Sequence, residues 1–232
     1  MIWIELLGPA GIGKSFLYNK LRERNIVNST ELSGFNNCLL INNKFVRAYL
    51  TKKFYKDLNC FKTEYSSVDA LTNEVFNKGL DTYTNDSRIK NKLQEYYHYK
   101  FKELKFLDHK LKKKDVFFSE DGILHLNYGI TQENINEILK PDFIISLTAS
   151  DEFINKNRIK RINNQKGNII EKQTSIEVLQ HTVFPKNIRL YKEKTEVLKK
   201  VYKDRFFEIN VEVDDVDLII SKIEEIIKWI KN

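Results

Sequence analysis

The sequence predicts an α/β fold: a three-layer sandwich with helices on both faces of a mostly parallel, five-stranded sheet. Two patterns predict it. Short apolar runs, typical of buried parallel strands, alternate with longer segments in which apolar residues recur every three or four positions, as on one side of a helix. No internal repeat or low-complexity linker interrupts them. At 232 residues the chain can bury a substantial core, and we expect a single unit over residues 1–232.

The first apolar run, residues 2–7, predicts the first strand, and Gly8 ends it. The chain then reads GPAGIGKS up to Ser15, which matches the phosphate-binding P-loop pattern G-x-x-x-x-G-K-S. Its glycines let the backbone bend around an anion, and a helix opening at Lys14 adds its positive pole. The predicted nucleotide-binding residues are Gly8, Pro9, Ala10, Gly11, Ile12, Gly13, Lys14, Ser15 and Phe16.

Two residues of this loop carry chemistry. The ammonium of Lys14 can reach the β- and γ-phosphates of a nucleotide, and the hydroxyl of Ser15 can ligate Mg²⁺. We therefore expect ATP and Mg²⁺ as cofactors, with Lys14 catalytic and Ser15 a metal ligand. A turn that binds nothing is disfavoured, because three of the eight glycines fall within these six residues, 8–13.

After the first helix, residues 38–41 predict a short second strand, and residues 43–114 predict a helical insertion. Ser66 with Asp69 three positions later is typical of a helix N-cap, and Gly79 is expected at the C-cap of the same helix. A second stripe at helical spacing predicts a long amphipathic helix: Leu93, Tyr97, Phe101, Leu104, Leu107 and Leu111. Core packing is favoured over stacking of a base or sugar for the aromatic residues Tyr96, Tyr97, Tyr99 and Phe101.

An acidic pair follows the third predicted strand, residues 116–118. Glu120 and Asp121 are expected at its carboxyl end, where ligands bind in open α/β sheets. Because neighbours on an extended chain point to opposite faces, one of the two should act as general base or orient a Mg²⁺-bound water. Glu120 is favoured, also as a residue on the metal side, and Asp121 is second. The alternative is a pair of solvated carboxylates.

A helix over residues 131–139, capped by Thr131 and stopped by Pro141, precedes the fourth strand at residues 142–147. The next helix, residues 151–162, carries Arg158 and Arg161 on one face. Placed after the fourth strand, these catalytic candidates can close over the triphosphate as a lid over about residues 151–173, with residues 165–168 as a mobile flap. The alternative is a solvated basic face.

The end of the chain predicts two more helices and the fifth strand. Thr174 and Glu177 form a candidate capping box, and Pro185 suits the first turn of a helix through residue 203. Residues 206–209 predict the last strand, and residues 214–231 predict a closing amphipathic helix.

The charge of the chain is +7, from 39 Lys and Arg against 32 Asp and Glu, which favours anionic partners such as nucleotides. Lysines on a solvated surface explain most of this excess of positive charge. The lysines within residues 110–114 are better explained as favourable charges at the negative end of a helix than as contacts to nucleic acid. The four scattered histidines predict no zinc site. Two cysteines without metal or redox spacing fit a reducing cytoplasm, where we expect the protein, and the first apolar run is too short for a signal sequence or membrane span.

The combination of GPAGIGKS after the first strand, FFSEDG on the third and RIKR after the fourth resembles the P-loop kinase group that includes nucleoside and nucleoside-monophosphate kinases. It also resembles kinase-like P-loop proteins with Asp-Glu-Gly at the second motif, which are linked to bacterial surface-polysaccharide synthesis; here the motif is Glu120-Asp121-Gly122. The resemblance implies the strand order 2-3-1-4-5, an acceptor-binding helical region between strands two and three, and an arginine-bearing lid. The Asp-Arg or Glu-Arg pair of many nucleotide kinases is missing.

Two functions fit these features. The first is a Mg²⁺-dependent kinase that moves the γ-phosphoryl group of ATP to a hydroxyl or phosphate of a small acceptor, a nucleoside, a nucleotide or a sugar of surface-glycan metabolism, held by residues 43–114. The second is a P-loop ATPase switch that acts through a macromolecular partner. The long insertion favours the kinase. We expect ATP and an unidentified small acceptor as partners; nucleic acid is disfavoured and a homodimer is left open.

Overall fold

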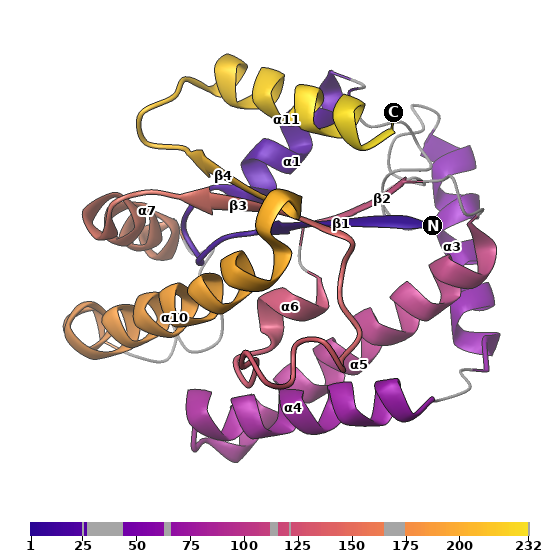
Figure 1. Cartoon of the computed structure of the whole chain (residues 1–232), viewed down its shortest axis with the longest axis horizontal. Helices are drawn as coiled ribbons and strands as arrows, with labels where there is room; N and C mark the ends of the chain where they lie inside the picture. The colour runs from indigo at the N-terminus through magenta and orange to yellow at the C-terminus, as the bar shows by residue number, and fades with distance from the viewer. Residues whose placement is uncertain are drawn as a thin grey trace.

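The computed structural model describes residues 1–24, 26, 44–62, 66–111, 116–120, 122–164 and 175–231. Its centre is a sheet with the strand order β2-β1-β3-β4, made by β1 (Ile2–Leu7), β2 (Val116–Ser119), β3 (Phe143–Thr148) and β4 (Phe206–Asn210) (Figure 1). Each neighbouring pair is parallel, with Trp3 opposite Phe117 and Ile4 opposite Phe143. The predicted α/β fold with a parallel sheet is therefore confirmed, and the carboxyl ends of these strands share one edge.

The described part of the sheet has four strands, not the five that the sequence predicts. Residues 38–41, expected to form the second strand, lie outside the described residues. Without that strand, the order 2-3-1-4-5 implied by the resemblance becomes 3-1-4-5, which is the observed order.

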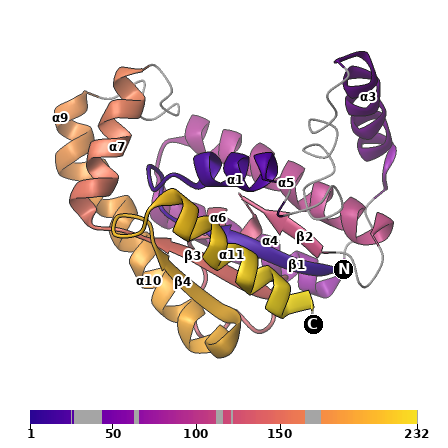
Figure 2. The ribbon, with the colours of Figure 1, turned by 90° about the horizontal axis from the view of Figure 1, so that it is seen from above.

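Alternate residues of β1 face opposite layers of helices. Ile4 and Leu6 belong to a core shared with α1 (Lys14–Glu23) and α11 (Val216–Lys231), which lie side by side on one face of the sheet (Figure 1 and Figure 2). Trp3 and Leu7 point to the opposite face. That face is covered by α4 (Ser67–Tyr83), α5 (Ser87–Lys110), α6 (Ile123–Leu126) and α10 (Phe184–Tyr202). Because both faces of these strands are apolar, each needs its own layer of helices.

The predicted cap at Ser66 is confirmed at the start of α4. Its hydroxyl accepts a hydrogen bond from the Asp69 backbone N–H at 3.3 Å, and the Asp69 carboxylate accepts one from the Ser66 N–H at 2.8 Å. Lys105 of α5 donates to the same buried carboxylate at 3.0 Å, which ties the two helices together. Burial raises the pKa of Asp69, but the hydrogen bonds from Ser66 and Lys105 outweigh it and hold the pKa below its ordinary value.

Gly79 does not end α4, so the predicted C-cap is wrong. The helix continues to Tyr83, and Gly79 lies where the helix backbone passes Gly129. A Cβ on Gly79 would lie 2.2 Å from the backbone nitrogen of Gly129, far inside a normal contact. The glycine thus serves the close approach of two backbone segments rather than a helix end.

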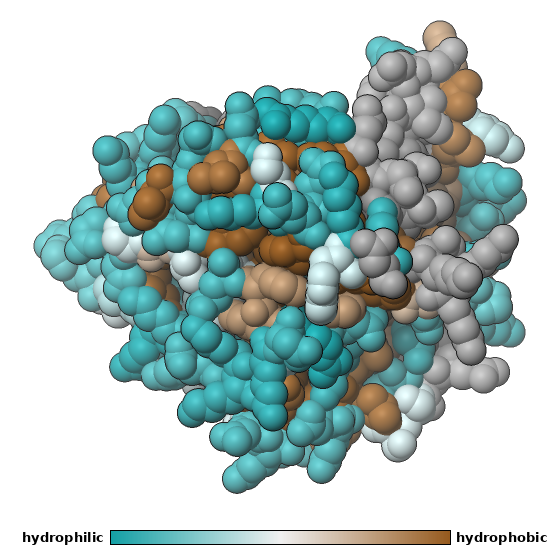
Figure 3. Space-filling model, turned by 45° about the horizontal axis from the view of Figure 1, so that its top comes forward, coloured by the Kyte–Doolittle hydropathy of each residue, from teal (hydrophilic) through white to brown (hydrophobic). Residues whose placement is uncertain are grey.

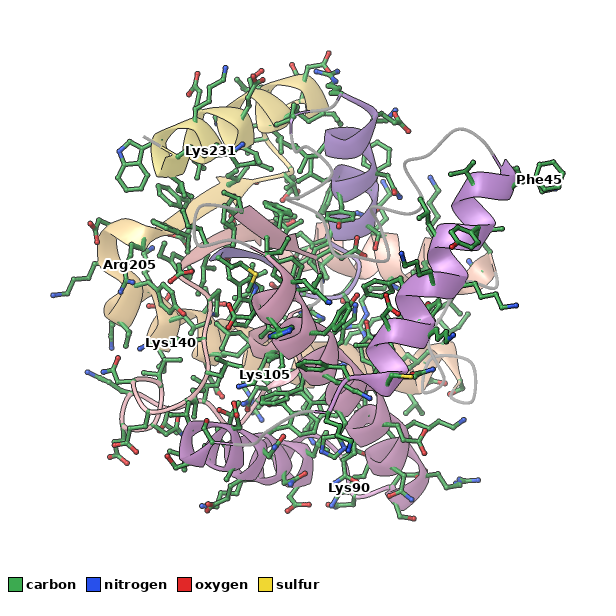
Figure 4. All side chains as sticks on the ribbon, turned by 90° about the vertical axis from the view of Figure 1, so that its right-hand side faces the viewer. Phe45, Lys90, Lys105, Lys140, Arg205 and Lys231 are labelled. Atoms are coloured by element: carbon green, nitrogen blue, oxygen red, sulfur yellow. The ribbon has the colours of Figure 1, made fainter. Side chains whose placement is uncertain are left out.

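The long amphipathic helix predicted between residues 93 and 111 is α5, which ends at Lys110. Tyr97 and Phe101 are buried, and the Tyr97 ring stacks on Phe76 with 3.6 Å between ring centroids. These two aromatic residues pack the core, as predicted, whereas Tyr96 is 39% exposed and the core prediction is wrong for it. Phe45 differs: it lies near the start of α3 (Lys44–Cys60), is 86% exposed and points away from the molecule (Figure 4).

Residues 131–139 form turns, not the predicted helix. Thr131 and Asn134 do exchange the hydrogen bonds of a helix cap, Thr131 N–H to Asn134 Oδ1 at 2.9 Å and Asn134 N–H to Thr131 Oγ1 at 3.4 Å. However, the N–H of Leu139 donates to the Thr72 hydroxyl at 2.8 Å. A tertiary contact to α4 therefore takes a backbone donor that a helix would have used.

Four further helical elements lie between β3 and β4 in the described part of the chain. They are α7 (Asp151–Asn163), α9 (Ile176–Val178), one π-helical turn η2 (Leu179–Val183) that runs into α10, and a 3₁₀ turn η3 (Lys203–Arg205). Ser175 caps α9, whereas Thr174 and the flap expected at residues 165–168 lie outside the described residues. Hydrophilic residues cover most of the face in Figure 3, with hydrophobic ones between them. No helix in the described ranges is long and apolar enough to cross a bilayer.

Candidate functional site

The loop between β1 and α1 has the backbone that an anion site requires. Gly11 and Gly13 adopt φ angles of 91° and 101°, the left-handed region that other residues rarely enter and that lets successive N–H groups converge. Helix α1 begins at Lys14, which places its positive pole at this loop. The Lys14 side chain is 8% exposed, and its ammonium donates to the Gly8 carbonyl at 2.7 Å, so it folds back over the loop.

Ser15 and Glu120 meet at the carboxyl edge of the sheet. The Ser15 hydroxyl donates to Glu120 Oε1 at 2.6 Å, although 105 positions separate the two residues. They meet because β1 and β2 are neighbours, and each residue follows one of these strands. A hydroxyl and a carboxylate are the hard oxygen ligands that Mg²⁺ prefers, so this pair fits a magnesium ion. Asp121, the second acidic candidate, lies outside the described residues.

A cavity of about 760 Å³, called here the donor cavity, lies against the loop, and residues 9–16 line it. Three cationic side chains, Lys14, Lys160 and Arg161, line it as well, and its described lining contains no carboxylate. The other lining residues are Leu17, His125, Leu147, Phe153, Asn157, Val211, Val216 and Ile219. Positive charge beside an apolar wall suits a ligand with a polyphosphate chain and a base.

A second cavity, of about 150 Å³ and called here the acceptor cavity, adjoins the first, because Pro9, Ala10 and His125 line both. Tyr83 and Tyr128 line the acceptor cavity, and their rings stack with 4.8 Å between centroids and 6° between planes. Its other lining residues are Phe76, Leu80, Leu93, Arg158, Asn187 and Tyr191. The helical insertion, through α4 and α5, therefore contributes an aromatic pocket next to the P-loop.

The two arginines of α7 lie along different cavities. Arg161 lines the donor cavity and Arg158 lines the acceptor cavity. Arg158 is 1% exposed, and its guanidinium carbon lies 3.7 Å from the centroid of the Phe184 ring, a cation–π contact. A Cβ on Gly11 would lie 2.5 Å from Arg158 Cγ. The stem of Arg158 thus packs directly against the loop between β1 and α1, which links α7 to that loop.

A buried carboxylate holds the amino end of α6. Glu5 of β1 is 0% exposed; its Oε1 accepts the His125 N–H at 2.7 Å and its Oε2 accepts the Leu124 N–H at 3.4 Å. Both donors belong to the first turn of α6, where a helix leaves its N–H groups unpaired. A Cβ on Gly122 would lie 2.1 Å from Glu5 Oε2, so glycine at this position leaves room for the carboxylate.

A buried lysine holds the opposite end of α6. Lys194 of α10 is 4% exposed, and its Nζ donates to the carbonyls of Leu124 at 2.8 Å and His125 at 2.9 Å. Burial lowers the pKa of Lys194 to about 7; the Glu5 carboxylate opposes this shift and Lys14 adds to it. A neutral amine keeps two hydrogens, enough for both carbonyls, so α6 keeps these contacts in either protonation state.

Sequence reasoning misses Glu5, His125 and Lys194. Glu5 carries a usable signal, since a single acidic residue inside an apolar strand is costly unless it has a partner. Lys194 carries a weaker one: it lies three positions after Tyr191 and four before Leu198, on the buried face of α10. His125 has no distinguishing spacing, and its importance depends on contacts between distant segments.

Comparisons with known proteins bear on the fold. No protein-family model matches the chain, and no curated protein sequence matches it either. Among solved structures, the chain is similar to deoxyadenosine kinase from M. mycoides with bound dATP, at 16% identity and a TM-score of 0.50, over 96% of this chain and 99% of that one. The same kinase with bound dCTP gives 17% identity and a TM-score of 0.48, over 97% and 100% of the two chains. The likeness to the dATP-bound structure shows that the two chains share a fold.

Proposed function

We propose that the protein is a Mg²⁺-dependent kinase that transfers the γ-phosphoryl group of ATP to a hydroxyl of a nucleoside-like acceptor. The observation that carries the proposal is the pair of adjoining cavities, one cationic and against the P-loop, the other aromatic, with Pro9, Ala10 and His125 in the wall of both. A kinase must hold donor and acceptor together with the reacting atoms about 3 Å apart, and two cavities with a common wall meet that requirement.

The donor cavity holds the nucleotide in this proposal. The backbone of residues 8–15 and the Lys14 ammonium surround the β- and γ-phosphates, and Arg161 neutralises charge that develops on the transferred group. Ser15 and Glu120 hold Mg²⁺, which neutralises the phosphate oxygens when bound. We assign Glu120 to the metal side because of its hydrogen bond to Ser15, and Asp121 remains the second candidate for that role.

The acceptor cavity holds the acceptor. Tyr83, Tyr128 and Phe76 offer aromatic surface against which a flat base can pack. Arg158 is the one described lining residue with a permanent positive charge, and its guanidinium already stacks on Phe184. This favours an uncharged nucleoside over a nucleoside monophosphate or sugar phosphate, whose phosphate binds best to several cations. The fold shared with a deoxyadenosine kinase supports the same class of acceptor.

A transfer assay tests the proposal. The protein is incubated with γ-labelled ATP and Mg²⁺ against nucleosides, nucleoside monophosphates, sugars including those of surface glycans, and sugar phosphates. We expect label on a nucleoside, and loss of about 10²-fold or more in kcat for Lys14→Met, since one charged contact to the developing transition state is removed. The control is Lys92→Met, a change at an exposed position on α5, which should leave turnover unchanged.

Three results would change the proposal. Label on a sugar or a nucleoside monophosphate would show that the acceptor belongs to that class instead, and the protein would still be a kinase. Fast ATP hydrolysis that needs no small acceptor and rises with a macromolecule would favour the ATPase switch instead. Equal turnover by the wild-type protein and Lys14→Met would remove the P-loop from the reaction.

A further inference from the structure

The proposed reaction needs a group that faces the acceptor hydroxyl and takes its proton. Glu120, the carboxylate favoured from the sequence, is hydrogen-bonded to Ser15 and does not line the acceptor cavity. Among the described residues, His125 is the ionisable side chain found in the lining of both cavities. It therefore lies where a hydroxyl in the acceptor cavity would meet a γ-phosphate in the donor cavity.

The backbone of His125 is fixed on both sides. Its N–H donates to Glu5 Oε1 at 2.7 Å, and its carbonyl accepts from the Lys194 ammonium at 2.9 Å. Glu5 comes from the central strand β1 and Lys194 from α10, so elements from distant parts of the chain converge on one residue of a four-residue helix. A buried acid and a buried lysine are costly to keep, and they are retained most readily where they hold something in place.

We propose that His125 contacts the acceptor hydroxyl and receives its proton, and that Glu5 and Lys194 position His125 through α6; this rests on the kinase function proposed above. As the acceptor oxygen bonds to the γ-phosphorus, the bond from that phosphorus to the oxygen bridging to the β-phosphate breaks. The hydroxyl proton passes to the imidazole, and ADP leaves with the electron pair of the broken bond. His125 is thus a catalytic residue, and Glu5 and Lys194 are positioning residues.

The first experiment compares His125→Ala and His125→Gln with His98→Gln, a matched change at an exposed histidine of α5. Both His125 variants should lower kcat by about 10²-fold or more, the usual contribution of a proton acceptor. Both should still bind Mg·ATP in calorimetry, because in this proposal the P-loop and Lys14, not His125, hold the phosphates. Glutamine can accept the hydroxyl's hydrogen bond but not its proton, so His125→Gln should keep a near-normal acceptor KM without recovering kcat.

The second experiment tests the positioning role with Lys194→Met, alone and combined with His125→Gln. The lysine acts only through His125 in this proposal, so the double variant should be no slower than His125→Gln alone. Lys194→Met alone should lose about 10-fold or more in kcat, because a small displacement of a reacting group is costly. Rates are divided by the fraction of protein that binds Mg·ATP, which removes any effect of misfolding.

The outcomes separate this inference from the proposed function. Absence of transfer by the wild-type protein would overturn both. Transfer by the wild-type protein with His125→Ala as fast as His98→Gln would overturn the role of His125 and leave the kinase intact. Additive losses in the double variant would overturn the positioning role of Lys194. Since His125 is only half-buried, its variants decide the catalytic role even if Lys194→Met fails to fold.

Discussion

Replacing Gly79 with alanine should weaken both the fold and the acceptor cavity. An added Cβ would lie 2.2 Å from the nitrogen of Gly129, 2.8 Å from the carbonyl carbon of Tyr128 and 3.0 Å from the Cα of Gly129. All three are backbone atoms, so no side chain can rotate away, and α4 or residues 128–129 must move by about 1 Å. Alanine gains about 1 kcal/mol over glycine inside a helix, whereas overpacking typically costs about 1–3 kcal/mol. The upper part of that range, about 2–3 kcal/mol, applies here because both sides of the contact are backbone.

The net effect that we expect is a loss of about 1–2 kcal/mol in the free energy of unfolding, or about 2–8 °C in Tm for a chain of this size. Urea denaturation measures it, with Lys78→Ala, the exposed neighbour on α4, as a control that should change stability by no more than about 0.5 kcal/mol. The acceptor KM should rise as well, because the displaced segment carries Tyr128, whose ring stacks on Tyr83 in the acceptor cavity.

The result that would refute this reasoning is a Gly79→Ala protein at least as stable as the wild type. Helix propensity would then be the larger effect, and the two backbones could not lie as close as the structure places them. A stability loss with an unchanged acceptor KM would separate the packing of α4 from the geometry of the cavity.

Three further predictions concern the loop and the buried charges. Gly11→Ala forces a non-glycine residue to a φ of 91° and against Arg158, which should weaken Mg·ATP binding by about 5- to 30-fold in calorimetry; an unchanged Kd would contradict the loop geometry. The pKa of Asp69 is lowered on folding, so its carboxylate stabilises the protein above about pH 4, and this stabilisation is lost as the pH falls through the folded pKa. In urea denaturation at a series of pH values, Asp69→Asn should therefore lose less stability on acidification than the wild type. An equal loss in both proteins would contradict the stabilising contact between Asp69 and Lys105. Burial lowers the pKa of Lys194 to about 7, so above pH 7 this side chain binds more protons in the unfolded state than in the folded state. The free energy of unfolding of the wild type, relative to that of Lys194→Met, should therefore rise from pH 7 to 10. A stability difference between the two proteins that does not change with pH would contradict the lowered pKa.

The fold was largely predictable from local patterns. Short apolar runs mark β1, β2, β3 and β4 to within two residues, because strands of a parallel sheet that is covered by helices are mostly apolar; the buried Glu5 of β1 and the exposed Glu208 of β4 are exceptions. The N-cap at Ser66 was predictable because it depends on residues three positions apart. Gly79 was misread because a glycine needed for a close approach and a glycine needed for a helix end look alike in sequence.

In the candidate site, too, the features that depend on local sequence were predictable and those that depend on distant contacts were not. The backbone angles of the P-loop follow from its own glycines, so its geometry could be anticipated. The placement of Arg158 and Arg161 along different cavities depends instead on how α7 packs against Phe184 and the loop. The contacts of Glu5 with α6 span about 120 positions, and no local pattern encodes them.

The wall common to the two cavities has a kinetic consequence. In the proposed kinase a nucleoside and ATP occupy the two cavities together, so no residue of the protein has to be phosphorylated during the reaction, and turnover requires a ternary complex. Double-reciprocal plots at several acceptor concentrations should therefore intersect rather than run parallel. A single compound that tethers a nucleoside to the end of a nucleotide's phosphate chain would span both cavities, and its second half would bind at the high effective concentration that the short link creates.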